Sequence, residues 1–136
     1  ELQALCDRYE MGVEILQLVL QDVNPPQEVR ASFNEVNQAI NHAATALGAC
    51  SRVAVAVAGA IPQLGFVHED SGWAFCLDIA DLFREDIALE GAFSAVRAYR
   101  ERGGELERWV RRGVGKRIRE RKVLPAMIDR IKELLA

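Results

Sequence analysis

One long periodic stretch constrains the fold of this chain more than any other feature of its sequence. Between Pro26 and about Gly59 the apolar residues recur every three or four positions, which places them on one face of an α-helix. These residues are Val29, Phe33, Val36, Ile40, Ala43, Ala44 and Leu47. Asn24 is a suitable N-cap, and a proline is well tolerated in the first helical turn. We therefore expect one long helix whose apolar face is buried in a bundle.

The remaining segments complete the predicted fold class, which is mostly α: a helical bundle with one N-terminal β-strand. Helical spacing covers residues 1–9, 73–86, 88–101, 105–121 and 123–135. A loop is expected between Ile61 and Gly72, where proline and glycine recur. Trp73 and Phe75 are expected to be core residues that hold this loop against the next helix.

The strand is expected at residues 12–20, which are apolar at nearly every position and rich in β-branched and aliphatic side chains. An exposed strand needs a neighbouring edge. If this strand pairs with a copy of itself or with another protein, the chain is a homodimer or has a protein partner. If it packs on the bundle, the chain is a monomer.

Length and composition predict a single soluble domain covering residues 1–136. The three cysteines have neither paired nor metal-ligand spacing, so we expect reduced thiols and a cytoplasmic location. The longest apolar run, Val53 to Val67, is too short to span a bilayer and is interrupted by Pro62. We therefore expect no membrane association.

A basic segment stands out against the net charge of −3. Between Arg97 and Lys122 there are eleven basic and four acidic residues, a local charge of about +7, so the rest of the chain carries about −10. Such a segment predicts a polyanion such as DNA as partner. The candidate DNA-binding residues are Arg108, Arg111, Arg112, Lys116, Arg117, Arg119, Arg121 and Lys122. The alternative is a solvated helix face with Glu–Arg pairs such as Glu107/Arg111. Trp109 is expected to be a core anchor rather than a base-stacking platform.

Three further residues are candidates for a metal site. His68 precedes a turn, and Asp78 and Asp81 follow it, three residues apart on one helical face. Carboxylate oxygens with one imidazole suit Mg²⁺ or Mn²⁺ better than zinc. The alternative makes His68 a loop residue, Asp78 a helix cap and Asp81 a solvated carboxylate.

The motifs around these residues resemble the C-terminal helical domain of the CRISPR adaptation integrases, which are metal-dependent DNA endonucleases, most closely the I-E subtype. The resemblance covers residues 37–136. It rests on Asn37-Gln38, Ala43/Ala44, Leu47-Gly48, Gly65-Phe66-Val67-His68, Asp78-Ile79-Ala80-Asp81, Arg111-Arg112, Arg117, Arg121 and Leu124-Pro125-Ala126-Met127-Ile128. It implies that His68, Asp78 and Asp81 are catalytic, with His68 and Asp81 as the metal ligands.

The chain departs from that family in two ways. A tyrosine expected after Leu47 is missing, and so is the glutamate that the family supplies upstream of Asn37-Gln38. With two protein ligands, Mg²⁺ or Mn²⁺ would bind weakly or not at all, so we expect impaired catalysis. The competing hypothesis is a non-enzymatic interaction module that binds or blocks a CRISPR protein or another partner.

Residues 1–39 carry a second resemblance, to the stomatin/prohibitin/flotillin superfamily and especially to regulatory subunits of a bacterial membrane-bound AAA protease. It rests on Leu20-Gln21-Asp22-Val23 with Pro25-Pro26, on Glu28-Val29-Arg30 and on Phe33-Asn34-Glu35-Val36-Asn37. This resemblance implies structural residues only. The two resemblances meet at Val36-Asn37-Gln38-Ala39, so we interpret the chain as a chimera joined within one helix.

Overall fold

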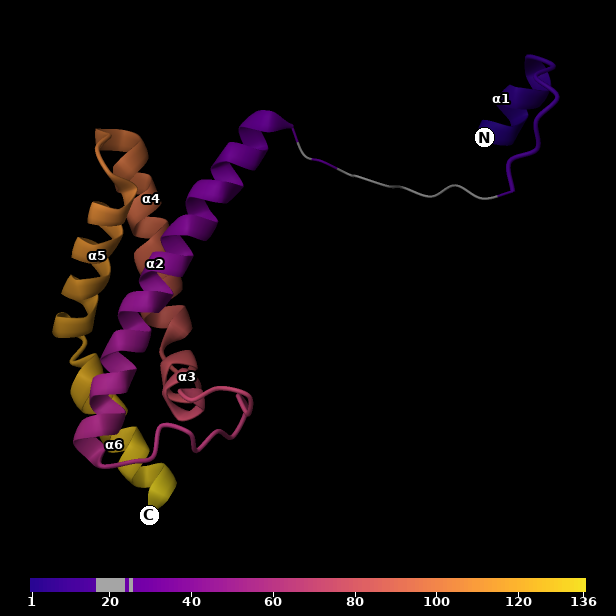
Figure 1. Ribbon diagram of the computed structural model, residues 1–136. Coiled ribbons are helices and arrows are strands. Elements are labelled where there is room, and N and C mark those ends of the chain that lie inside the picture. The colour runs from indigo at the N-terminus through magenta and orange to yellow at the C-terminus, as the bar shows by residue number, and fades with distance from the viewer. Residues whose placement is uncertain (17–23, 25) are drawn as a thin grey trace.

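The computed structural model describes residues 1–16, 24 and 26–136 and confirms a mostly helical fold. In chain order the elements are α1 (Leu2–Arg8), α2 (Gln27–Ala58), α3 (Ala74–Asp81), the π-helix η1 (Arg84–Leu89), α4 (Glu90–Arg102), α5 (Leu106–Glu120) and α6 (Val123–Leu135). Each predicted helix is found, although the expected helix at 73–86 is divided at Leu82 and Phe83 into α3 and η1. Figure 1 shows α3 to α6 gathered along α2.

Helix α2 is the axis of the bundle, because it contacts every other helical element from α3 to α6. At 32 residues it is roughly 48 Å long, the length expected from about 1.5 Å per residue. Its buried face consists of Ala39, Ala43, Leu47, Ser51, Ala54 and Val55. Small side chains at these positions let neighbouring helices approach closely. Gly59 ends α2 in the left-handed conformation, with φ of 71°, which a glycine adopts without strain.

The core lies between the second half of α2 and the later helices. Its largest fully buried side chains outside α2 are Phe75, Ile79, Ile87, Val110, Val114, Val123, Met127 and Ile131. The one buried polar side chain among the described residues is Ser51, whose hydroxyl donates a hydrogen bond of 2.6 Å to the carbonyl oxygen of Cys76. That bond joins α2 to α3 and satisfies the hydroxyl in the core.

Three predictions of burial were wrong. Val29 and Phe33 are 42% and 60% exposed because nothing in the described bundle covers the first turns of α2. Trp73, at 47%, lies on the surface with the Arg52 guanidinium 4.8 Å from its ring centroid, whereas Phe75 is fully buried. The apolar pattern predicted the helix correctly. Which part of its apolar face is buried depends on where the other helices pack, and that is decided by the tertiary structure.

The predicted N-terminal strand is also wrong for the part of it that the structure describes. Residues 12–16 form no strand, while residues 17–20 lie outside the described residues. The side chain of Gln3 instead donates to the carbonyl oxygen of Val13 at 3.1 Å and accepts from the amide of Ile15 at 2.7 Å. A β-rich composition needs a neighbouring edge, and the described part of the chain offers only helices and loops.

Among the described residues, no helix is both long enough and apolar enough to cross a membrane.

Candidate metal centre and basic surface

His68 lies on the loop between α2 and α3, and this loop positions it beside α3. Gly65 is essential to its path, because a Cβ there would overlap the carbonyl oxygen of His68 and lie 2.8 Å from the Cβ of Ala74. The amide of Phe75 donates to the carbonyl oxygen of Pro62 at 2.9 Å, which fixes the loop to the first turn of α3. The loop thus folds back tightly over α3.

Asp78 holds the end of this loop in place. Its carboxylate accepts hydrogen bonds from the amides of Phe66 at 2.6 Å, Val67 at 3.1 Å and His68 at 3.1 Å. It also lies 2.7 Å from Nδ1 of the His68 ring, and its side chain is only 9% exposed. Burial of this carboxyl raises its pKa, but the bonds from the Phe66 amide, the His68 ring and the other two amides outweigh burial and lower the pKa to about 2.

The same contact orients the imidazole of His68. An ionised carboxylate only accepts hydrogen bonds, so Nδ1 of the ring carries the proton that it donates to Asp78. In the neutral ring the lone pair is therefore on Nε2, which lies 3.9 Å from Oδ2 of Asp81. A histidine whose second nitrogen donates to a carboxylate is the usual arrangement of a metal ligand.

The donor set fits a two-ligand site for a hard divalent cation. His68 Nε2 and Asp81 Oδ2 face each other at 3.9 Å, with side-chain exposures of 39% and 49%. Asp78 is occupied by four donors, so its role is to position His68. Within residues 1–16 and 26–136 no group of three or more His, Cys, Asp or Glu side chains is arranged so that all of them could hold one metal ion. Mg²⁺ is commonly held by one or two carboxylates, with water and substrate phosphate completing its shell.

A cavity of about 200 Å³ opens beside His68 and Asp81. Its lining comes from α2, the loop, α3 and η1: Ala44, Leu47, Gly48, His68, Leu77, Ala80, Asp81 and Arg84. Nη1 of Arg84 lies 3.7 Å from Oδ1 of Asp81, so Asp81 lies between an imidazole and a guanidinium. Sequence reasoning missed Arg84, although its spacing three residues after Asp81 is that of neighbours on a helix.

Ion pairs occupy four of the eight candidate DNA-binding residues. Arg117 of α5 and Arg121, which directly follows α5, both form ion pairs with Glu90 of α4, at 2.7 and 3.1 Å. Arg117 also donates a hydrogen bond of 2.8 Å to the Ser94 hydroxyl. Within α5, the pairs Arg111–Glu107 and Lys116–Glu120 measure 3.1 and 3.6 Å. Arg111 and Lys116 thus form pairs along one helix face, as the alternative expected, whereas Arg117 and Arg121 pair with a different helix.

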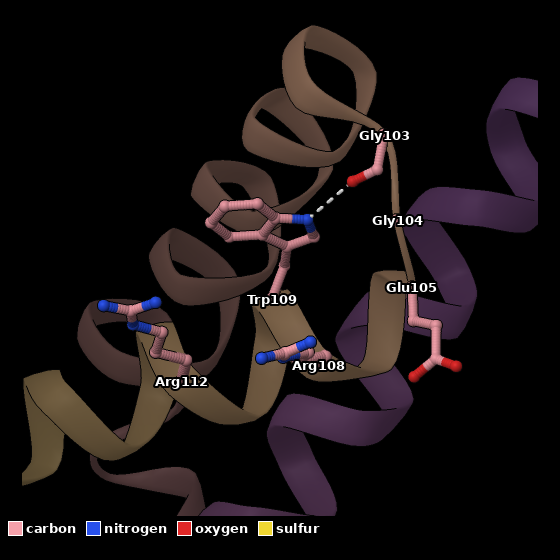
Figure 2. Close-up of a pocket in the computed structure, with 6 residues that line it drawn as sticks. All are labelled: Gly103, Gly104, Glu105, Arg108, Trp109 and Arg112. Atoms are coloured by element: carbon pink, nitrogen blue, oxygen red, sulfur yellow. Dashed lines mark hydrogen bonds between the residues drawn. The ribbon is translucent and has the colours of Figure 1, made fainter.

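The other four candidates, Arg108, Arg112, Arg119 and Lys122, have no ion-pair partner in the described part of the chain. Arg108 and Arg112 lie on successive turns of α5 beside a pocket of about 380 Å³, which Figure 2 shows at the turn from α4. Gly103, Gly104, Glu105 and Trp109 complete the pocket.

Trp109 fixes the geometry of that turn. Its ring NH donates a hydrogen bond of 2.9 Å to the carbonyl oxygen of Gly103, drawn as a dashed line in Figure 2. The Arg102 guanidinium lies 5.6 Å from the centroid of the Trp109 ring. The side chain of Trp109 also packs against the hydrophobic core. These contacts support the interpretation of Trp109 as an anchor.

The comparisons with known proteins agree with the resemblance of the larger segment. The chain is 34% identical over 101 residues to the CRISPR-associated endonuclease Cas1 of Escherichia coli K12, covering 74% of this chain and 32% of that protein. It is 34% identical over 94 residues to the CRISPR-associated endonuclease Cas1 2 of Thermus thermophilus, covering 69% and 28%. The chain thus spans about a third of the length of the curated relatives it matches. No family model matches.

The fold is shared with a solved structure, that of the TtCas1–DNA complex. The TM-score is 0.70 at 24% sequence identity, and the match covers 99% of this chain and 60% of that chain. Nothing in these comparisons supports the second resemblance, so the interpretation of residues 1–39 as a stomatin/prohibitin segment, and of the chain as a chimera, stays a prediction.

Proposed function

We propose that this chain is a Cas1-like DNA-processing domain of CRISPR adaptation, with a weak divalent-metal site and a DNA-binding surface on α5. The observation that carries the proposal is the facing pair of His68 Nε2 and Asp81 Oδ2 at 3.9 Å, with Asp78 fixing the ring. The identity of 34% to Cas1 endonucleases supports the same chemistry.

In this proposal each residue has a distinct role. When bound, Mg²⁺ or Mn²⁺ would neutralise the phosphate and activate the attacking hydroxyl for endonuclease and strand-transfer chemistry. His68 and Asp81 would hold the ion. Asp78 keeps the proton on Nδ1 of His68 and so keeps Nε2 available as a ligand.

DNA would lie along the basic surface through the residues that internal ion pairs leave available, namely Arg108, Arg112, Arg119 and Lys122. Such contacts neutralise phosphates without reading bases, and they weaken steeply with added salt. Arg111 and Lys116 are paired with glutamates of α5 itself, and Arg117 and Arg121 are paired with Glu90 of α4.

Catalysis is proposed to be impaired. The facing pair of His68 and Asp81 supplies two protein ligands. The glutamate that the family places upstream of Asn37-Gln38 is expected to be missing, and Glu28 and Glu35 are the candidates to substitute for it. An ion held by two side chains depends on water and DNA phosphate for the rest of its shell. We therefore expect metal binding that is weak in the free protein and stronger when DNA is present.

The test is cleavage and strand transfer on a branched DNA with Mn²⁺ or Mg²⁺, alongside metal-dependent DNA binding. We expect Mn²⁺ to strengthen binding of the wild-type protein, and the His68→Ala/Asp81→Ala variant to lose that effect together with any turnover. Unchanged Mn²⁺ dependence in the double variant would refute the metal site.

The DNA surface is tested separately by the salt dependence of binding. Arg108→Ala/Arg112→Ala should lower the slope of log K against log salt by somewhat under two, because each phosphate contact contributes about 0.7 to 0.9. Arg130→Ala/Lys132→Ala on α6 is the control and should leave the slope unchanged. Equal slopes in all three proteins would refute a role for Arg108 and Arg112.

A second candidate function, a protein-binding module, is favoured by one observation. An uncovered apolar groove of about 620 Å³ lies between the first turns of α2 and Phe93 of α4. Phe33 and Phe93 are 60% and 56% exposed there. If a purified Cas1 endonuclease forms a complex that Phe33→Glu abolishes, the chain is a binding module; if no complex forms, this candidate fails.

A further inference from the structure

The cavity beside His68 and Asp81 contains one cation of the protein's own, Arg84. This side chain starts η1, directly after the turn that ends α3, and it is 53% exposed. Its distance of 3.7 Å to Asp81 is longer than a hydrogen bond, so electrostatic attraction holds the pair without fixing its geometry. The guanidinium is therefore close to the site but free to turn.

Asp81 has two oxygens with different neighbours. Oδ2 faces Nε2 of His68 at 3.9 Å, and Oδ1 faces Nη1 of Arg84 at 3.7 Å. A metal ion bound by His68 and Asp81 would share this carboxylate with the guanidinium. Two cations competing for one carboxylate disfavour each other, so metal binding should weaken the contact between Asp81 and Arg84.

The charges indicate where the released guanidinium would go. With a neutral imidazole, Asp78, Asp81 and Arg84 leave the site with one negative charge, and a divalent ion makes it singly positive. One phosphodiester then brings it to neutrality, whereas without Arg84 the same complex would be negative. Guanidinium is also well suited to phosphate, because its planar donors match two phosphate oxygens at once.

We propose that Arg84 is a phosphate clamp of this site, which pairs with Asp81 when no metal is bound and turns to the DNA phosphate when the metal takes Asp81. The inference rests on the proposed function, since it needs a metal at His68 and Asp81. It predicts effects of opposite sign: Arg84 should weaken metal binding in the absence of DNA and strengthen phosphate binding in its presence.

The experiment compares Arg84→Gln and Arg84→Lys with wild type, and with Arg130→Gln as matched control. Arg130 also forms an exposed ion pair at three-residue spacing, 2.7 Å from Glu133, but on α6. Mn²⁺ affinity without DNA is measured by electron paramagnetic resonance. Binding of a fluorescent thymidine octamer is measured with Mn²⁺ and with EDTA, and circular dichroism checks the fold.

Without DNA, Arg84→Gln should bind Mn²⁺ about two- to fivefold more tightly, the range expected from removing one exposed ion pair. With Mn²⁺, the same variant should bind the octamer at least about tenfold more weakly, as expected for a lost charge-assisted hydrogen bond. Arg84→Lys should recover part of the octamer affinity, and Arg130→Gln should match wild type in both assays.

Equal or weaker Mn²⁺ binding in Arg84→Gln would overturn the exchange at Asp81, and unchanged octamer binding would overturn the clamp. Either result leaves the metal site standing if wild type binds Mn²⁺ and His68→Ala/Asp81→Ala does not. A wild-type protein that binds no Mn²⁺ overturns both this inference and the proposed metal site.

Discussion

Replacing Asp78 with asparagine should destabilise the protein by about 2 kcal/mol at neutral pH. The folded structure lowers the pKa of this carboxyl from its ordinary 3.8 to about 2. Since one pKa unit corresponds to about 1.4 kcal/mol, the folded state stabilises the ionised form relative to the neutral form by about 2 kcal/mol more than the unfolded chain does. Asparagine has the same shape but is neutral. Its NH2 group would replace either Oδ2, which accepts from the Phe66 amide, or Oδ1, which accepts from the His68 amide, and would face a donor there.

The pH dependence gives this prediction a specific sign. A group whose pKa is lower in the folded state contributes stability above its unfolded pKa and loses it as the pH falls through its folded pKa. The contribution of Asp78 should thus be complete above about pH 5 and mostly gone near pH 2, so the difference between wild type and Asp78→Asn should shrink over that window.

Urea unfolding followed by circular dichroism, at several pH values between neutral and acidic, measures this difference directly. Asp70→Asn is the control, because Asp70 is exposed in the same loop. A loss at neutral pH within the roughly 0.5 kcal/mol typical of surface substitutions would refute the reasoning. A loss that stays constant down to about pH 2 would refute the part that rests on ionisation.

Two further predictions concern the loop and the candidate ligands. The His68→Ala/Asp81→Ala variant should lose less than about 1 kcal/mol, because both side chains are substantially exposed; a fall in melting temperature beyond about 6 °C would make these residues structural instead. Gly65→Ala should cost more than about 1 kcal/mol and weaken Mn²⁺ binding, since a Cβ there displaces the His68 backbone. Gly72→Ala has no atom within 4 Å of the added carbon and serves as its control. Urea unfolding and Mn²⁺ titration of Gly65→Ala and Gly72→Ala test this prediction. Wild-type stability and Mn²⁺ affinity in Gly65→Ala would contradict the role assigned to Gly65.

The helices were predictable because their signals are local. The periodic apolar positions of α2 and the glycines after α4 act within a few residues, and they placed these helices close to their observed bounds. Burial was less predictable. Phe33 and Leu47 share one pattern on α2, yet Phe33 is 60% exposed and Leu47 is 1% exposed, because later helices cover only one of them.

The candidate site shows the same division. The spacing of Asp78 and Asp81 puts both on one helical face, and that much follows from sequence. The difference between them does not, because it arises from a loop that returns three amides to Asp78 and leaves Asp81 beside Arg84. The predicted strand failed for a related reason, since a strand is stabilised by a neighbouring edge that the described part of the chain lacks.

By itself, the sequence determined the helical class, the positions of the helices and the concentration of basic residues, which are properties of composition and short-range spacing. The three residues of the candidate metal centre were proposed from their spacing together with the family resemblance. Only the tertiary structure decided which basic residues are available for a polyanion, since Arg117 is neutralised by Glu90 on a different helix. It also decided that Asp78 positions His68 while Asp81 remains open to a ligand, because hydrogen bonds and ion pairs join residues that the fold, and not the spacing, brings together.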